Sequence, residues 1–104
     1  MIRYFDKEAH DLAFDACSSE LLKYGMPAAL VPGVARYCID HIETGQFLRA
    51  VLENDLLGAF RRADPESLMH MQNILDALLM VAPSPCWGSN QAVEGWLKEG
   101  VTDD

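Results

Sequence analysis

The residues that could do chemistry begin with Cys38 and His41, which are spaced i, i+3 and could bind one metal ion from a single helical turn. A structural zinc site needs a second pair of ligands. The candidates that remain are single, scattered residues: Cys17, Cys86, His10 and His70. We therefore interpret the pair as a core cysteine beside a surface histidine, and we expect no metal and no cofactor.

Cys86 is the thiol best placed for catalysis, because it lies in a predicted loop. No motif places a general base or an oxyanion hole near it, and the neighbouring Trp87 favours burial. Carboxylate pairs such as Asp40 with Glu43 carry no special weight in an acidic chain. The glycines are dispersed and form no phosphate-binding loop. We expect a protein that is not an enzyme, with a small cysteine-dependent enzyme as one alternative.

The charge of the chain argues against binding to nucleic acid or to membranes. Sixteen acidic residues outnumber eight basic ones, for a net charge of −8, whereas phosphate groups and anionic lipids attract Lys and Arg. No apolar run approaches the length of about 18 residues that spans a bilayer. A modest basic quartet is outnumbered by acids within residues 32–64, and consists of Arg36, Arg49, Arg61 and Arg62.

The acidic residues are distributed unevenly. Residues 65–104 carry six acids and only one base, Lys98. Glu8, Asp11 and Asp15 are spaced i, i+3, i+7 and share one face of a predicted helix. Such surfaces either keep a protein soluble or bind a basic site on another protein. The candidate protein-binding residues are Glu8, Asp11, Asp15, Glu94 and Glu99, together with Trp87.

Trp87 belongs to the segment with the most distinctive composition, Ser84–Ser89. Pro83 and Pro85 restrain this loop, and the indole N–H needs a hydrogen-bond partner wherever it is buried. The ring either fills a gap between helices or is an exposed anchor for a partner. The burial of Trp87 separates these two interpretations.

Helices must position all of these residues. Apolar residues recur at helical spacing over about 6–24, 33–42, 46–62, 64–82 and 89–99. Predicted N-caps are Asp6, Asp64 and Ser89, with Pro65 in a first turn. Asp55 could cap a new helix, so residues 46–62 form either one bent helix or two short ones. No window alternates as a strand would. We predict an all-α fold, a compact orthogonal bundle of five or six short helices.

The helical spacing also predicts which side chains face the core. Leu12 and Leu21 lie on the inner stripe of the first helix, and Ile42 ends that of the second. The predicted inner faces of the later helices include Leu56, Phe60, Leu68, Met71, Leu75, Leu78, Leu79 and Val93.

A chain of 104 residues fits one domain. We divide it into an N-terminal helix in residues 1–25, a helical core in residues 27–100 and a frayed tail in residues 101–104. The first residues are already charged and do not resemble a signal peptide. Three cysteines without a CxxC pair are then typical of reduced thiols in the cytoplasm.

Two sequence blocks carry a resemblance to known proteins. They are FLRAVLENDL at residues 47–56 and CWGS at residues 86–89. Together they resemble a widespread group of short, uncharacterised helical proteins encoded by bacteriophages, prophages and their bacterial hosts. The resemblance covers roughly residues 27–97 and leaves the first 25 residues outside it. It implies a helical fold and a mobile-element context, and it implies no catalytic residue.

Small acidic phage proteins often bind and block, or redirect, a host machine. By this analogy, we expect a non-enzymatic protein that binds a host protein or complex in the bacterial cytoplasm. Its role would be to inhibit a defence system such as CRISPR, or to modulate transcription or replication. The alternative is a homo-oligomeric structural or assembly factor, for instance a homodimer, that covers apolar residues which one small bundle cannot bury.

Overall fold

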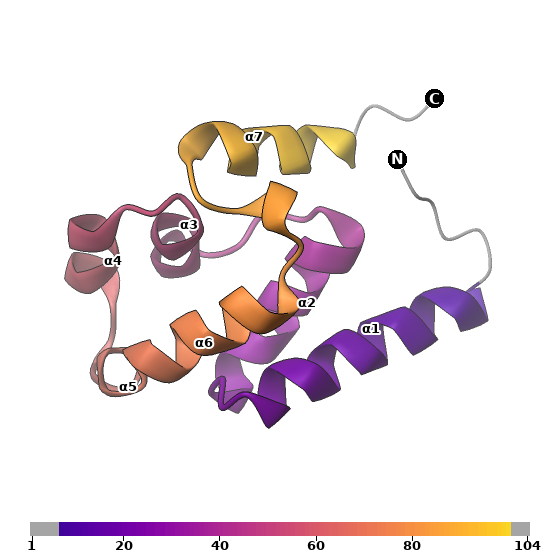
Figure 1. Cartoon of the computed structure of the whole chain (residues 1–104), viewed down its shortest axis with the longest axis horizontal. Helices are drawn as coiled ribbons and strands as arrows, with labels where there is room; N and C mark the ends of the chain where they lie inside the picture. Colours follow the sequence, from indigo (N-terminus) through magenta and orange to yellow (C-terminus); the bar gives the residue numbers. More distant parts are fainter. Residues whose placement is uncertain (1–6, 101–104) are drawn as a thin grey trace.

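Helices joined by short connections make up the protein in a computed structural model that describes residues 7–100 (Figure 1). The α-helices are α1 (Lys7–Lys23), α2 (Val31–Asp40), α3 (Gln46–Leu52), α4 (Leu56–Arg62), α5 (Pro65–Met69), α6 (Met71–Val81) and α7 (Asn90–Glu99). Two single-turn 3-10 helices, η1 (Ala28–Leu30) and η2 (Ser84–Cys86), precede α2 and α7. None of the described residues lies in a strand, which confirms the all-α prediction. The predicted cap Asp6 and the predicted tail 101–104 lie outside the described residues.

The expected number of five or six helices is wrong, because residues 7–100 contain seven α-helices. Residues 46–62 form two helices separated by Glu53–Asp55, so the second of the two alternatives for this segment is correct. The single helix expected over residues 64–82 is interrupted at His70, whose φ of −105° and ψ of 20° bend the chain between α5 and α6. No glycine or proline marks this bend in the sequence.

Side-chain caps start three of the helices. Asp55 accepts a hydrogen bond from the backbone N–H of Gly58 at 3.0 Å and begins α4. Asp64 accepts one from Ser67 at 2.7 Å and begins α5, and this bond lowers the pKa of the Asp64 carboxyl. Each cap satisfies a backbone donor that the first turn leaves without an intrahelical partner. Ser89 begins α7 in the same way, as the sequence predicts.

The core gathers apolar side chains from every α-helix except α5. α1 packs on α2 and α6, and α3 packs on α4 and α7. The fully buried large side chains are Leu21, Val34, Tyr37, Leu52, Ile74, Leu78, Cys86 and Val93. The molecule is flat, with principal extents of 38 × 28 × 18 Å. A body only about two helix diameters thick cannot enclose both faces of its helices.

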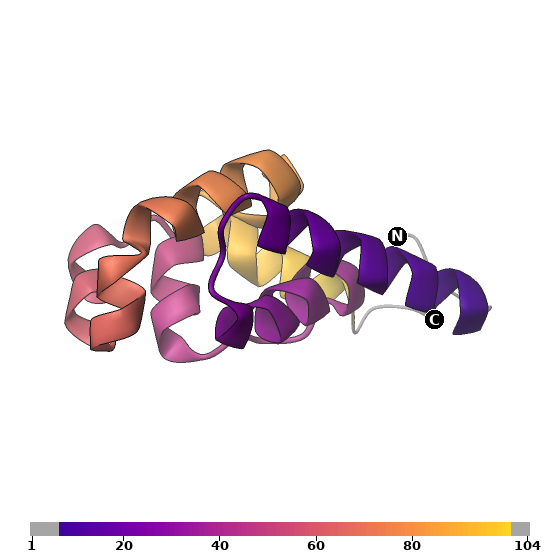
Figure 2. The same ribbon diagram turned by 90° about the horizontal axis from the view of Figure 1, so that it is seen from below.

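Several side chains predicted to face the core are exposed instead. Leu12 is 67 % exposed, because the first half of α1 extends beyond the other helices (Figure 2). Ile42 is exposed because α2 ends at Asp40, and His41 then turns the chain with a left-handed φ of 59°. The remaining exceptions lie on α4, α5 and α6: Leu56, Phe60, Leu68, Leu75 and Leu79. Within the described stretch, no helix is both long and apolar enough to cross a lipid bilayer.

Candidate functional site

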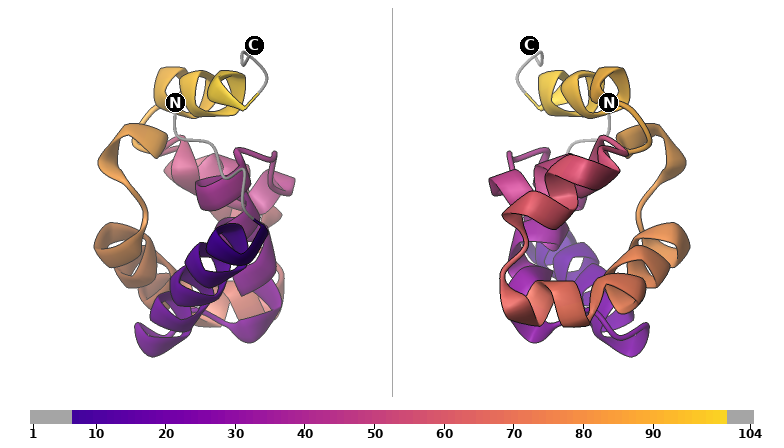
Figure 3. Two further views of the ribbon diagram at one scale, coloured as in Figure 1. Left: turned by 90° about the vertical axis from the view of Figure 1, so that its right-hand side faces the viewer. Right: turned by 90° about the vertical axis from the view of Figure 1, so that its left-hand side faces the viewer.

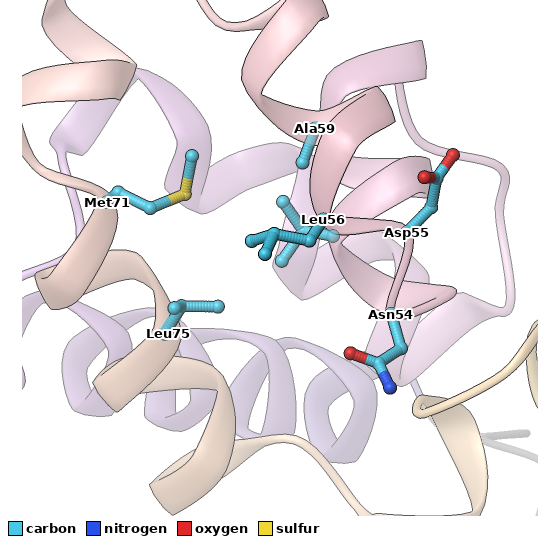
Figure 4. A pocket seen from close by; sticks show the side chains of 7 residues that line it. Asn54, Asp55, Leu56, Ala59, Met71 and Leu75 are labelled. Carbon is cyan, nitrogen blue, oxygen red and sulfur yellow. The ribbon is translucent and has the colours of Figure 1, made fainter.

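The exposed apolar side chains of α4 and α6 border a groove (Figure 4). Met71 and Leu75 of α6 line one side, and Leu56 and Ala59 of α4 line the other, with Asn54 at one end. The groove has a volume of about 100 Å³. Its complete lining is Val51, Asn54, Asp55, Leu56, Ala59, Met71 and Leu75.

The link between α3 and α4 shapes this groove. Asn54 has a left-handed φ of 65°, a conformation that asparagine tolerates better than most residues, and it stops α3. Asp55 then caps α4, so the two helices pack against each other. A β-carbon at Gly58 would lie only 2.2 Å from an Asp55 carboxylate oxygen, so a larger residue there would have to displace the capping side chain. This turn places Leu56 in the first turn of α4, opposite Leu75.

Further large apolar side chains are exposed on α4, α5 and α6. Phe60 is one helical turn from Leu56, and Leu79 is one turn from Leu75, so each lies beside its groove residue. Leu56 is 62 % exposed and Leu79 is 60 % exposed. We call the following eight exposed residues the α4–α6 apolar surface: Leu56, Leu57, Phe60, Leu68, Met69, Leu75, Leu79 and Met80.

The groove is suited to binding and lacks catalytic groups. Asp55 is the one titratable residue among those that line it, and its carboxylate is already hydrogen-bonded to the backbone of α4. The other lining side chains are apolar, apart from the amide of Asn54. Such a lining can receive an apolar side chain and orient it with one amide.

α7, at the top of both views in Figure 3, is joined to α3 by polar side chains. The Arg49 guanidinium of α3 forms ion pairs with Glu43 at 2.6 Å, with Glu53 at 2.5 Å and with Glu94 of α7. Asn90 also donates a hydrogen bond to Glu53 at 2.8 Å. This cluster joins α7 to α3, and its three carboxylates share the single positive charge of Arg49.

The pKa values of this cluster follow from its contacts. Partial burial would lower the pKa of Arg49, but hydrogen bonds to Glu53 and Glu94 outweigh burial and raise it above its ordinary value. Partial burial likewise opposes ionisation of Glu53, yet the hydrogen bonds from Arg49 and Asn90 lower its pKa. Both groups are therefore fixed in their charged forms and serve to clamp helices together.

A scan against protein-family models, a search of curated proteins and a search of solved structures each returned no match for the chain. The resemblance to phage-encoded proteins therefore stays a prediction from the sequence blocks.

The predicted acidic face on α1 is exposed and partly neutralised. Glu8, Asp11 and Asp15 are all exposed on α1. Asp11 forms ion pairs with Lys7 at 2.9 Å and with His10 at 3.2 Å, and these contacts lower the pKa of its carboxyl. The α1 face therefore presents less free negative charge than its three carboxylates suggest.

The other predicted binding residues, Trp87, Glu94 and Glu99, differ in their burial and in their contacts. Trp87 is half-buried and packs against the core, which agrees with a structural role. Glu94 is engaged by Arg49, whereas Glu99 is exposed at the end of α7. The structure thus separates these residues from one another and from the groove.

The Cys38–His41 pair does not converge on one point. His41 places its Nδ1 atom 2.8 Å from the carbonyl oxygen of Trp96, while the Cys38 side chain is buried in the core. No group of three or more potential ligands in residues 7–100 is arranged to bind a metal ion. Cys86 is also buried, and its carbonyl oxygen accepts a hydrogen bond from the Tyr37 hydroxyl at 2.5 Å.

The sequence analysis missed the groove, although a signal was present. Leu56 and Leu57 are adjacent, as are Leu68 and Met69, and Leu78–Val81 is a continuous apolar run. Neighbouring residues on a helix point about 100° apart, so such runs cannot all face one core. The excess apolar residues on α4–α6 are the pattern that could have indicated an exposed surface.

Proposed function

We propose that this protein acts without catalysis, by binding another protein at the groove between α4 and α6. The observation that supports this function best is the α4–α6 apolar surface, which is exposed on three consecutive helices. Large apolar side chains that are exposed beside a groove are typical of surfaces that bind another protein. The partner that fits best is an amphipathic helix that inserts apolar side chains into the groove, with basic residues beside them.

The exposed apolar side chains can supply a large part of the free energy that such binding needs. The exposed fractions of its eight residues add up to between four and five complete side chains. Since burying one large apolar side chain contributes about 1.5–3 kcal/mol, burying all of them contributes on the order of 10 kcal/mol. Loss of translational and rotational freedom opposes association by about 4–15 kcal/mol. The apolar contact therefore roughly offsets this cost, and polar contacts around the groove must supply the net affinity.

Charge indicates the chemistry of the partner. The net charge of −8 attracts a basic protein and repels a second copy of the same chain. Exposed Glu66 of α5 and Asp76 of α6 are available to basic side chains. A helix with apolar residues on one face can lie in a groove between two helices. We infer a heterologous, basic helix as the occupant.

The resemblance to phage and prophage proteins extends this proposal to a bacterial host. The partner would then be a host protein or complex, such as a CRISPR-type defence complex or a transcription or replication factor, that this protein inhibits or redirects. The exposed carboxylates of Asp15 and Glu99 would add to the negative field that attracts the basic partner.

Three immobilised baits test the proposal in a bacterial lysate: the unchanged protein, Leu56→Ser/Leu79→Ser and Leu12→Ser. Leu12 is the matched control, because it is as exposed as Leu56 but lies on α1, away from the groove. We expect a basic partner that the unchanged protein and Leu12→Ser retain, and that the double variant loses. Equal retention by all three baits would overturn the groove as the binding site.

The homo-oligomeric alternative is tested by sedimentation of the purified protein. We expect a monomer at high concentration and physiological salt. A dimer that Leu56→Ser/Leu79→Ser dissociates would assign the groove to a second copy and contradict a heterologous partner.

A further inference from the structure

α5 is the helix that the rest of the protein holds least. It contributes no side chain to the core, whereas each of the other α-helices does. Leu68 is 46 % exposed and Met69 is 79 % exposed, and the residue that α5 buries is the small Ser67. Few buried apolar contacts are characteristic of segments that unfold locally while the remainder of a protein stays folded.

The hydrogen bonds of α5 are local as well. Asp64 accepts one from the backbone N–H of Ser67 at 2.7 Å. The backbone N–H groups of Leu68 and His70 donate to carbonyl oxygens of the same segment. Among the described residues, the hydrogen bonds of α5 thus stay between Asp64 and His70. A helix of five residues is only marginally stable without such support from its neighbours.

Both ends of α5 interrupt the helical backbone. Ala63 and Asp64, between α4 and α5, are extended, with ψ of 136° and 170°. His70, between α5 and α6, bends the chain with a φ of −105° and a ψ of 20°. Residues at the ends of elements are the ones that absorb backbone rotation in hinges. Rotation at these two junctions moves α5 without unwinding α4 or α6.

The connection at the other end of α6 is fixed, in contrast to α5. Cys86 of η2 is fully buried, and its carbonyl oxygen accepts a hydrogen bond from the Tyr37 hydroxyl at 2.5 Å. Two residues later, the Gly88 N–H donates to the carbonyl oxygen of Leu52 on α3 at 2.7 Å. The chain that enters α6 is therefore free to move, and the chain that leaves it is not.

α5 connects α4 to α6 beside one end of the groove (Figure 1). Asn54 lies at one end of the groove, and Ala59 and Met71 lie at the other (Figure 4). Met71 directly follows the bend at His70, so α5 adjoins this second end. The groove has a volume of about 100 Å³, whereas a cavity that accommodates benzene is about 150 Å³. It admits one apolar side chain, although a bound helix anchors itself through several successive turns.

We propose that α5 is a movable strap, which leaves the end of the groove when a partner binds and so lengthens the groove for successive side chains of one helix. The identity of that helix rests on the proposed function, whereas the movement of α5 can be measured without a partner. In the free protein the released form is a minor state, and binding stabilises it.

Hydrogen–deuterium exchange of the intact protein, resolved by NMR, tests whether α5 opens by itself. The amides of Leu68 and His70 should exchange at least about tenfold faster than that of Gly88, which is bonded to a different helix. Low concentrations of urea should leave the exchange of α5 unchanged, because local opening exposes little surface. Equal exchange rates with the same dependence on urea would mean that α5 unfolds only with the whole protein, and would overturn the proposal.

Variants connect the movement of α5 to the groove. Asp64→Ala removes the cap of α5, and Ser89→Ala, the matched control, removes the equivalent cap of α7. The probe is Nile red, a neutral apolar dye that is larger than the closed groove. Its dissociation constant should fall about fivefold for Asp64→Ala, because loss of the cap raises the population of the released form.

Ser89→Ala should leave dye binding unchanged, and Leu56→Ser added to Asp64→Ala should abolish the gain. Circular dichroism of each variant verifies that it is folded. Equal affinities of Asp64→Ala and the unchanged protein would contradict a strap that controls the groove. The lysate experiment is decided separately: if no partner is captured there, the proposed function fails, while exchange and dye binding still decide the movement of α5.

Discussion

Around α7 the protein pairs its polar groups with one another, whereas along α4–α6 it leaves large apolar side chains in contact with solvent. At the α7 end, Trp96 donates its indole N–H to the Tyr37 carbonyl at 2.8 Å, and Gly88 donates to the Leu52 carbonyl at 2.7 Å. Within residues 7–100, each buried side-chain nitrogen or oxygen has a hydrogen-bond partner. At the α4–α6 end, Met69 is 79 % exposed.

This difference indicates which surface of an acidic protein is the better candidate for binding a partner. Charge alone favoured residues such as Asp11 and Glu94, yet the structure pairs both with cations of the same chain. A carboxylate that is already paired contributes little additional binding energy. The exposed apolar residues of α4–α6 keep part of their surface in water, and a partner can cover it.

The largest expected effect comes from the buried tyrosine at the α7 end. Tyr37→Ala should lower the free energy of unfolding by about 3–5 kcal/mol, because it leaves a cavity in the core. Tyr37→Phe keeps the ring and loses the hydrogen bond to Cys86, and should lower it by about 1–3 kcal/mol. Urea denaturation measures both. If Tyr37→Phe were as stable as the unchanged protein, the hydrogen bond from Tyr37 would not contribute to the stability of the fold.

The next effect concerns the Arg49 cluster. Arg49→Met should lower the free energy of unfolding by about 2 kcal/mol, because Glu43, Glu53 and Glu94 lose their shared cation. Added salt should reduce this loss by screening the repulsion among the carboxylates. Arg61→Met, at an exposed arginine of α4, is the matched control and should change stability by less than about 0.5 kcal/mol. A loss that did not depend on salt would argue against the electrostatic explanation.

A smaller effect should depend on pH. Hydrogen bonds with Asp11 and Asp40 raise the pKa of His10, which connects α1 to the end of α2. A group with a raised pKa stabilises the fold fully below its unfolded value, and that contribution is lost as pH rises through the folded value. Thermal melting between about pH 5 and 8 should therefore show a modest loss of stability as pH increases. His10→Gln should remove this slope, and an unchanged slope would assign it to other groups.

The smallest expected effect on stability belongs to the groove. Leu56→Ser/Leu79→Ser should change the free energy of unfolding by less than about 0.5 kcal/mol, because both side chains are mostly in water. The same variant should lose its partner in the capture experiment. Urea denaturation provides the check, and a loss as large as that of Tyr37→Ala would mean that the apolar surface is part of the core.

Local features of the fold could be predicted from the sequence. Asp64–Pro65 and Ser89 start helices as their residue types indicate, since a cap depends only on its own first turn. The bend at His70 could not be predicted, because no local residue type imposes it. The exposure of Leu56 could not be predicted from the sequence either, since it depends on which helix packs against α4.

The candidate site was less predictable than the fold for the same reason. The groove joins residues near 55 to residues near 75. Sequence spacing describes neighbours on one helix, whereas these groups meet only after several helices have packed. The helical periodicity predicted too many buried residues, because not every apolar stripe packs against another helix.

The position of the two tryptophans has an optical consequence. Both lie in the segment after α6, Trp96 against the imidazole ring of His41 at 4.3 Å between ring centroids, and neither lines the groove. The intrinsic fluorescence of the protein therefore reports on the α7 end. Detachment of α7 should shift the emission maximum to longer wavelength. Binding of a helix in the groove should leave the emission maximum unchanged. One spectrum thus distinguishes a molecule that has lost part of its fold from one that has found its partner.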